Sequence, residues 1–156
     1  AGRIILIDVN QKERKKTAKW IFVTHKLADS NEVLDKLHSY NEKVKSRDVE
    51  EAREVWFAEE PLIMHVCCKD IPSAQKFVDV ALACSMKRSG IFSIKDERVM
   101  VEIIGCDKME VPIVHQGKIL VTDDYVKKLV TIANEKMKNI ELNNNKFLEM
   151  IKEKLK

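Results

Sequence analysis

The chain has 156 residues, of which 45% are hydrophobic and 34% charged, and its net charge is +3 at pH 7. This length and balance are typical of one folded domain and exclude a disordered chain. The four glycines are scattered, with no two within ten residues, which excludes the glycine-rich loops that bind dinucleotides or nucleoside triphosphates. Any nucleotide-like cofactor must therefore be bound in another way.

The first two predicted strands form a hairpin. The apolar run Arg3–Val9 is rich in isoleucine and valine, and Lys19–His25 is aromatic and β-branched, so both are typical of strands. The segment Asn10–Lys19 between them carries five basic residues and no apolar periodicity. We expect a hairpin with a long basic loop.

A helix and two strands should follow. Ser30 is predicted to cap the helix, and Val33, Leu34, Leu37, Asn41 and Val44 follow at three- and four-residue spacing. The charged stretch Lys45–Glu54 either extends this helix or connects it onward. Val55–Ala58 and Leu62–Cys68 are typical of strands, and Pro61 between them indicates a bulge or an edge break.

The middle of the chain predicts a second helix and two hairpins. Asp70-Ile71-Pro72-Ser73 is a helix start, and one face is expected to hold Ala74, Phe77, Val78, Ala81, Leu82 and Ser85. Two strands, Ile91–Ile94 and Val99–Ile104, join through a polar turn at Lys95–Arg98. A short hairpin of Val111–His115 and Lys118–Val121 then turns at Gln116-Gly117.

The last helix begins after Thr122, its predicted cap, with Asp123 and Asp124 suited to the helix dipole. Its apolar stripe consists of Val126, Leu129, Val130, Ala133, Met137 and Ile140, and a second stripe of Phe147, Ile151 and Leu155. The run Asn143–Asn145 predicts a break between the stripes. Together these elements predict an α/β protein of the α+β kind, a single mixed-sheet domain with flanking helices.

Charge and cysteine content bear on partners and location. Basic residues concentrate at the two ends of the chain, which favours a polyanion partner, although solvated surface is the alternative. The four cysteines show no Cys-x-x-Cys spacing, so we expect reduced core thiols and no metal site. No run reaches the ~20 apolar residues of a membrane span and no secretion signal is expected, so the predicted location is cytoplasmic.

Three clusters are candidate sites, and each has a plainer explanation. Gly2-Arg3 offers a planar fork for carboxylate or phosphate, or is a surface arginine at a strand start. His65 in an apolar strand is a candidate base, or a hydrogen-bonded strand residue. Ser89-Gly90 follows a helix, where glycine often serves only as a C-cap and the preceding Lys87-Arg88 as dipole partners.

In chain order these clusters match motifs of one family. The matching residues are Gly2-Arg3-Ile4, Trp20-x-Phe22-x-x-His25, Trp56-Phe57, Glu60–Val66, Ser89-Gly90-Ile91, Pro112-Ile113 and the pair Tyr125 and Asn134. In these motifs the chain resembles the tRNA wybutosine-synthesising protein 3 family, SAM-dependent methyltransferases of archaea and eukaryotes. The family's Ser-Ser-Cys-x-Gly-Arg motif is matched only from Gly2 on, and Ser85-Met86-Lys87-Arg88 departs from the family pattern. We therefore expect residues 1–156 to be one tRNA-methyltransferase domain that lacks the Ser-Ser-Cys and a leading helical segment.

The resemblance implies a fold distinct from the Rossmann-like methyltransferases. It also implies methyl transfer from S-adenosyl-L-methionine, with no metal, to N4 of 7-aminocarboxypropyl-demethylwyosine at position 37 of phenylalanine tRNA, in the anticodon loop. His65 would act as the base or orient the substrate, Arg3 would hold a carboxylate, and Ser89 would join them as catalytic residues. The implied cofactor-binding residues are Gly2, Arg3, His65, Ser89, Gly90 and Ile91.

The same resemblance suggests how tRNA is bound. Trp20 would stack on a base, and the tRNA-binding residues are predicted to be Lys12, Arg14, Lys15, Lys16, Lys19, Trp20 and His25. Two alternatives remain open at this point. One is a non-catalytic RNA-binding module that uses the same basic loop, and the other is a small-molecule enzyme with no nucleic-acid partner.

Overall fold

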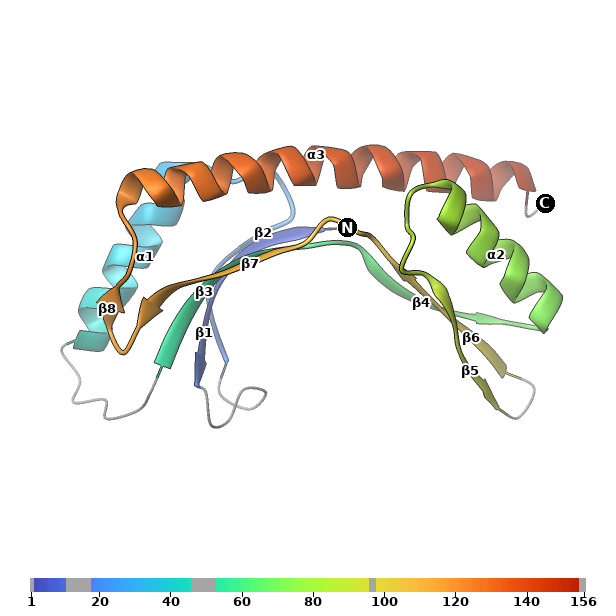
Figure 1. Ribbon diagram of the computed structural model, residues 1–156, viewed down its shortest axis with the longest axis horizontal. Helices are drawn as coiled ribbons and strands as arrows, with labels where there is room; N and C mark the ends of the chain where they lie inside the picture. The colour runs from blue at the N-terminus through green and yellow to red at the C-terminus, as the bar shows by residue number, and fades with distance from the viewer. Residues whose placement is uncertain (1, 11–17, 46–52, 96–97, 155–156) are drawn as a thin grey trace. The chain divides into compact units, whose positions relative to one another are not determined.

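The chain folds into eight strands and three helices within the part that the structure describes (Figure 1). A computed structural model describes residues 2–10, 18–45, 53–95 and 98–154. In chain order the elements are β1 (Arg3–Asn10), β2 (Lys19–Thr24), α1 (Ser30–Lys45), β3 (Arg53–Glu60), β4 (Ile63–Cys68), α2 (Ile71–Ala83), β5 (Gly90–Lys95), β6 (Arg98–Ile104), β7 (Met109–His115), β8 (Lys118–Ile119) and α3 (Asp123–Lys154). The α+β class predicted from the sequence is confirmed.

The strands form two antiparallel sheets where the sequence predicts one, and the chain divides into two compact units. The five-stranded unit comprises Arg3–Glu60 and Met109–Met137. The three-stranded unit comprises Ala1–Gly2, Pro61–Lys108 and Lys138–Lys156. All described strand pairs are antiparallel, which excludes the parallel sheet of Rossmann-like methyltransferases for the described residues. The single cooperative domain stays a prediction.

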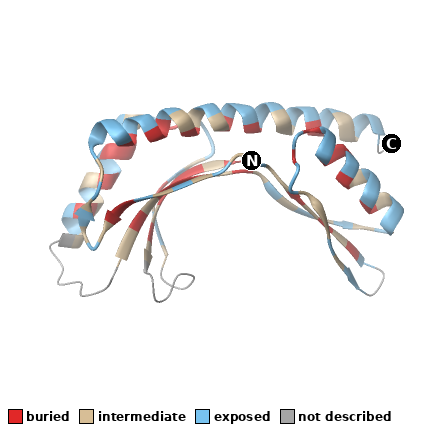
Figure 2. Cartoon of the chain, in the orientation of Figure 1, coloured by how far each residue is buried: buried red, intermediate tan, exposed pale blue. Residues whose placement is uncertain are grey.

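The five-stranded unit has strand order β2-β1-β3-β7-β8. Because side chains alternate across a strand, Ile4 and Leu6 of β1 share one face with Phe57 of β3, and all three are fully buried. Helix α1 and the first half of α3 cover this face (Figures 1 and 2), with buried residues Val33, Leu37, Val126, Leu129, Val130 and Ala133. The opposite face carries the alternate residues, beginning with Arg3.

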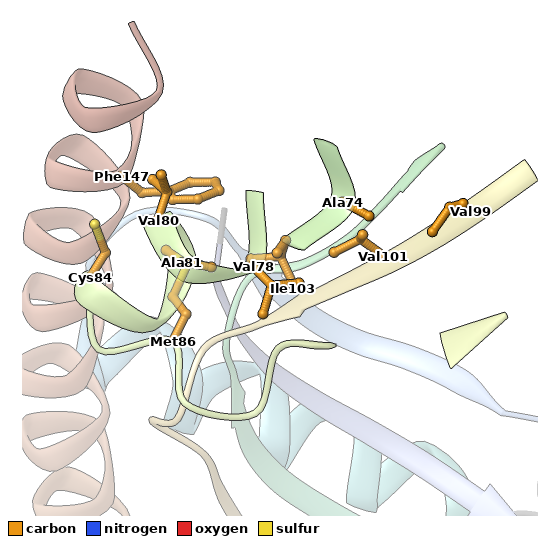
Figure 3. Close-up of a cluster of buried hydrophobic side chains, with 10 residues drawn as sticks. All are labelled: Ala74, Val78, Val80, Ala81, Cys84, Met86, Val99, Val101, Ile103 and Phe147. Carbon is orange, nitrogen blue, oxygen red and sulfur yellow. The ribbon is translucent and has the colours of Figure 1, made fainter. Parts of the chain in front are cut away.

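The three-stranded unit has strand order β4-β6-β5, and α2 packs on one face of this sheet. Its core gathers small and medium apolar side chains from α2 and β6 with Phe147 of α3 (Figure 3). Phe77 of α2 meets Phe147 edge to face, with ring centroids 5.6 Å apart. The C-terminal part of α3 is thereby part of this core.

Helix caps decide several local details. Asp70 caps α2 as predicted, since its carboxylate accepts from Ser73 N at 2.7 Å, and Thr122 Oγ1 accepts from Tyr125 N at 3.3 Å at the start of α3. The cap of α1 is Asp29, one residue before the predicted Ser30. Asp29 accepts from the backbone N–H groups of Asn31 and Glu32, so Ser30 is already helical.

The end of α2 differs from the prediction. Ser85 was expected on its apolar face, but it follows the helix in the left-handed region with φ 64°. Met86 N donates to Ala81 O and Ser85 N donates to Leu82 O, which is the Schellman arrangement with serine where glycine is usual. Leu82, which was expected on the apolar face, is exposed, whereas Val80, which was not, belongs to the core.

Two further expectations were wrong. Helix α3 continues through Asn143–Asn145 without a break, because the packing of Phe147 and Ile151 outweighs the low helix propensity of asparagine. The cysteines are free, but only Cys84 is fully buried, while Cys67 and Cys106 are exposed. The predicted basic loop and the stretch after α1 lie mainly outside the described residues.

Candidate active site

The five-stranded unit carries Arg3 on the face opposite its helices. Arg3 of β1 lies directly across from Glu60 of β3, and Arg3 Nε donates to Glu60 Oε2 at 2.5 Å. The Arg3 guanidinium also lies 4.8 Å from the ring centroid of Trp20 on β2, a cation–π distance. One side chain thus joins three strands, and its guanidinium already holds a carboxylate of its own chain.

The same face contains a hollow of about 250 Å³. It is lined by Ile5, Ile7, Val9, Trp56, Ala58, Glu60 and Glu110. The register explains its position, because Ile5 pairs with Ala58 and Ala58 with Glu110, which brings these residues to one side of the sheet. Ala58 is the smallest residue in the lining. The surface of the sheet is therefore lowest at Ala58, between its larger neighbours.

The three-stranded unit also exposes one sheet face, and His65 lies on it. His65 of β4 is directly opposite Glu102 of β6, and Nε2 of the histidine lies 2.9 Å from Oε1 of the glutamate. Phe92 of β5 contacts the imidazole with ring centroids 5.2 Å apart. Phe92 reaches this face by the ordinary alternation of side chains, two residues after Gly90, and the register of β5 and β6 shifts between Ile91 and Ser93.

Gly90 completes this surface. It pairs with Glu102 from the other side of β6, so Glu102 has His65 on one flank and Gly90 on the other. The Gly90 backbone is not left-handed, and a Cβ built there would meet nothing within 4 Å. Neither backbone conformation nor packing in this structure requires glycine, and its consequence is open room beside Glu102.

Ser89 and Ile91 flank Gly90 but face other surroundings. Ser89 Oγ accepts a hydrogen bond from Ile104 N at 3.1 Å, so this hydroxyl fastens the segment before β5 to the end of β6. Ile91 packs against the core cluster. Because Ser85 ends α2, Gly90 is not the helix C-cap that the sequence offered as its plainer explanation.

The predicted site residues are therefore only partly brought together. His65, Ser89, Gly90 and Ile91 belong to the three-stranded unit, and Arg3 belongs to the five-stranded unit with Trp20. Gly2 is buried. Of the predicted tRNA-binding residues, Lys19, Trp20 and His25 are exposed on or next to β2, whereas Lys12, Arg14, Lys15 and Lys16 lie outside the described residues.

Sequence reasoning missed Glu102, Phe92 and the lining of the hollow. A signal for Glu102 existed, because it is a single carboxylate within the apolar strand Val99–Ile104. Its pairing with His65 depends on the register of β4 and β6, which alternation alone does not provide. Ala58 had no signal, since a small residue in a strand is ordinary.

The described residues contain neither a metal site nor a helix that could span a membrane. No group of three histidine, cysteine, aspartate or glutamate residues there has the arrangement of a metal site. Among the helices in the same part of the chain, none has the length and apolar character needed to cross a membrane.

Comparison with known proteins supplies a family. The family described as Methyltransferase TYW3 matches residues 1–156. The mouse tRNA wybutosine-synthesizing protein 3 homolog is 31% identical over 159 aligned residues, which cover 100% of this chain and 58% of the mouse protein. A plant protein from Arabidopsis thaliana, tRNA wybutosine-synthesizing protein 2/3/4, is 40% identical across 81% of this chain and 13% of its own length.

Archaeal relatives are covered more fully. The Pyrococcus abyssi protein named tRNA(Phe) 7-((3-amino-3-carboxypropyl)-4-demethylwyosine(37)-N(4))-methyltransferase 1 is 29% identical over 98% of this chain and 74% of its own length. The solved structure of the PH1069 protein from Pyrococcus horikoshii superposes with a TM-score of 0.81 at 29% identity, covering 96% of this chain and 72% of that one.

The chain spans 13%, 58% and 50% of the first three curated relatives that it matches. The family match nevertheless extends over every residue of the chain, and the fold is shared with an archaeal relative across nearly all of it. On this evidence the chain belongs to the Methyltransferase TYW3 family.

Proposed function

We propose that this protein transfers a methyl group from S-adenosyl-L-methionine to N4 of 7-aminocarboxypropyl-demethylwyosine at position 37 of phenylalanine tRNA. The observation that carries the proposal is the family match over residues 1–156. The Pyrococcus abyssi relative is named for methyl transfer to N4 of this base at position 37 of phenylalanine tRNA. Further support comes from the charged pairs Arg3–Glu60 and His65–Glu102, which lie on the open sheet faces.

The residues present suit such a donor and such an acceptor. The methyl donor supplies an electrophilic methyl group on a sulfonium ion, together with an adenine and an amino-acid carboxylate. An arginine fork suits the carboxylate, and carboxylates near aromatic rings suit a cation. Arg3 and Glu60 provide the guanidinium and the carboxylate on the five-stranded unit.

His65 is proposed to accept the proton that leaves N4. The methyl carbon forms a bond to nitrogen as its bond to sulfur breaks, and the nitrogen then has to lose its proton. When Nε2 of His65 donates to Glu102 Oε1, Nδ1 is the ring nitrogen that accepts. Glu102 then acts as a positioning residue, because it selects the tautomer and holds the ring.

We propose that Ser89 contributes by position. Its hydroxyl accepts from Ile104 N, and this bond holds Gly90 next to Glu102. Backbone and open space at Gly90 would then give this sheet face room for a ligand in place of a glycine-rich loop. Ile91 contributes through its main chain, since its side chain packs toward the core.

Recognition of tRNA is assigned to β2 and the basic segment before it. Trp20 is 51% exposed, so its ring is available to stack on an unpaired base of a single-stranded loop. Lys19 and His25 are exposed on the same stretch of chain. Cationic contacts to phosphates would make binding weaken steeply as salt rises.

The test is a methylation assay with a mass readout. The chain is incubated with S-adenosyl-L-methionine and tRNA that carries the precursor base, and the nucleoside from position 37 is analysed by mass. We expect a gain of one methyl group and none when the tRNA lacks the precursor. Binding of tRNA without any transfer would favour the RNA-binding module and overturn the proposal.

A further inference from the structure

The hollow on the five-stranded sheet has a shape that follows from its register. Ala58 forms its floor between two larger neighbours on the same strand face, Trp56 and Glu60. Ile5 and Ile7 of β1 and Glu110 of β7 complete it from the adjacent strands. Its volume of about 250 Å³ is just below the range of about 300–1,000 Å³ for drug-sized ligands, so it suits one fused ring system.

The lining is apolar below and acidic at one side. Isoleucine side chains and an indole ring favour a flat aromatic group, which they can cover on its faces. Trp56 is oriented by its own hydrogen bond, because Nε1 donates to Glu54 Oε2 at 3.1 Å. The carboxylates of Glu60 and Glu110 accept N–H donors and repel phosphate or carboxylate groups.

We propose that this hollow binds a purine-type base, stacked against Trp56 with its N–H edge toward the carboxylate of Glu110. The inference rests on the proposed function in one respect, because that reaction offers two sources of such a base. One is the adenine of the methyl donor, and the other is the guanine-derived base of the tRNA. Both carry N–H donors on a flat ring, so one hollow suits either.

The sharpest test fills the hollow without removing any polar group. In Ala58→Leu the added side chain would occupy the space above the floor. The matched control is Ala83→Leu, the same exchange at an exposed position of α2, which belongs to the three-stranded unit and does not line the hollow. Both variants are compared with the unaltered chain by calorimetry with S-adenosylhomocysteine and by fluorescence anisotropy with an anticodon stem-loop RNA carrying the precursor base.

We expect Ala58→Leu to lower the affinity for one of the two probes about tenfold or more, because base stacking contributes about 1–3 kcal/mol per base. The affected probe identifies the source of the base. Ala83→Leu should leave both affinities within about twofold, a difference below about 0.5 kcal/mol. Unchanged binding of both probes to Ala58→Leu would overturn the inference.

A second variant covers the case in which Ala58→Leu does not fold. Glu110 is exposed, so Glu110→Gln should leave the fold intact while it removes the carboxylate. We expect it to lower the affinity for adenosine but not for purine riboside, which lacks the exocyclic amino group. Equal affinities of this variant and the unaltered chain for adenosine would contradict the assigned edge.

These binding measurements are separable from the proposed reaction. If the unaltered chain binds a probe and Ala58→Leu blocks it, the hollow is a base site even if no methyl group is transferred. If methyl transfer proceeds equally in the unaltered chain and in Ala58→Leu, the proposed function stands and the base site does not.

Discussion

The two sheets expose faces with the same pairing pattern but different chemistry. Each presents a basic residue directly opposite a glutamate on the neighbouring strand, Arg3 with Glu60 and His65 with Glu102. Each pair is partly exposed and has an aromatic ring beside the basic group, Trp20 in one unit and Phe92 in the other. The pairing pattern is the same, and the chemistry of the basic residue differs.

Arginine remains charged at all ordinary pH values, whereas histidine exchanges a proton near neutrality. The arginine face also has a hollow over Ala58, and the histidine face has open room at Gly90 beside Glu102. Under the proposed function, the arginine face would hold a ligand by fixed charge and shape. The other is suited to move a proton.

The largest expected effect tests the histidine face. His65→Ala should lower the rate of methyl transfer about 10²–10⁴-fold, the usual contribution of a general base. The control is His38→Ala, because His38 forms a similar exposed pair with Asp123 at 2.9 Å on the five-stranded unit. Initial rates with the precursor tRNA decide the question, and equal rates for both variants would remove His65 from the chemistry.

The next prediction asks whether the two units unfold together. Phe147→Ala should destabilise the three-stranded core by about 3–5 kcal/mol, the usual cost of deleting a buried phenylalanine ring. Both tryptophans, Trp20 and Trp56, belong to the five-stranded unit, so their fluorescence reports that unit alone. In a single cooperative domain the fluorescence midpoint in urea falls as well. A midpoint that stays in place while circular dichroism shows an early transition would mean two domains.

A smaller effect tests the arginine face. Arg3→Ala should lower the affinity for S-adenosylhomocysteine about ten- to a hundredfold, because a hydrogen bond to a charged group contributes about 1.5–3 kcal/mol. Arg3→Lys keeps the charge but loses the planar fork, and we expect an intermediate affinity. Calorimetric titration of both variants measures this, and full affinity in Arg3→Ala would show that Glu60 is the only carboxylate that Arg3 serves.

The smallest effect concerns the cap of α2. Hydrogen bonds from Ser73 lower the pKa of Asp70 in the folded chain below its ordinary value of 3.8. The ionised cap therefore stabilises the fold above that pH, and its contribution is lost as pH falls through the lowered pKa. We expect Asp70→Asn to have a lower melting temperature than the unaltered chain at pH 7, and the difference to shrink as the pH is lowered below 3.8. Asp35→Asn on α1 serves as the control for loss of a surface carboxylate, and a pH-independent difference for Asp70→Asn would refute the contribution of the charge at this cap.

Much of the local structure was predictable because it depends on near neighbours in the chain. The strand β1, the cap at Asp70 and the buried stripe from Val126 to Ile140 follow from alternation, capping chemistry and helical period. Errors came where distant packing outweighed these preferences. Asn144 stays helical because the same helix is tied to a core through Phe147, and Ser85 takes a left-handed conformation that places Met86 in that core.

The residue pattern was enough to identify the family, to mark Arg3 and His65 as candidates, and to assign most elements as strand or helix. The tertiary structure alone decided which glutamate each of them meets, where a small alanine leaves a hollow, and that Gly90 borders Glu102 and is not the cap of α2. Cross-strand partners depend on register, and register is set by the packing of whole sheets. Residues such as Arg3 and Glu60, 57 positions apart, therefore acquire a shared chemistry only when the sheet has formed.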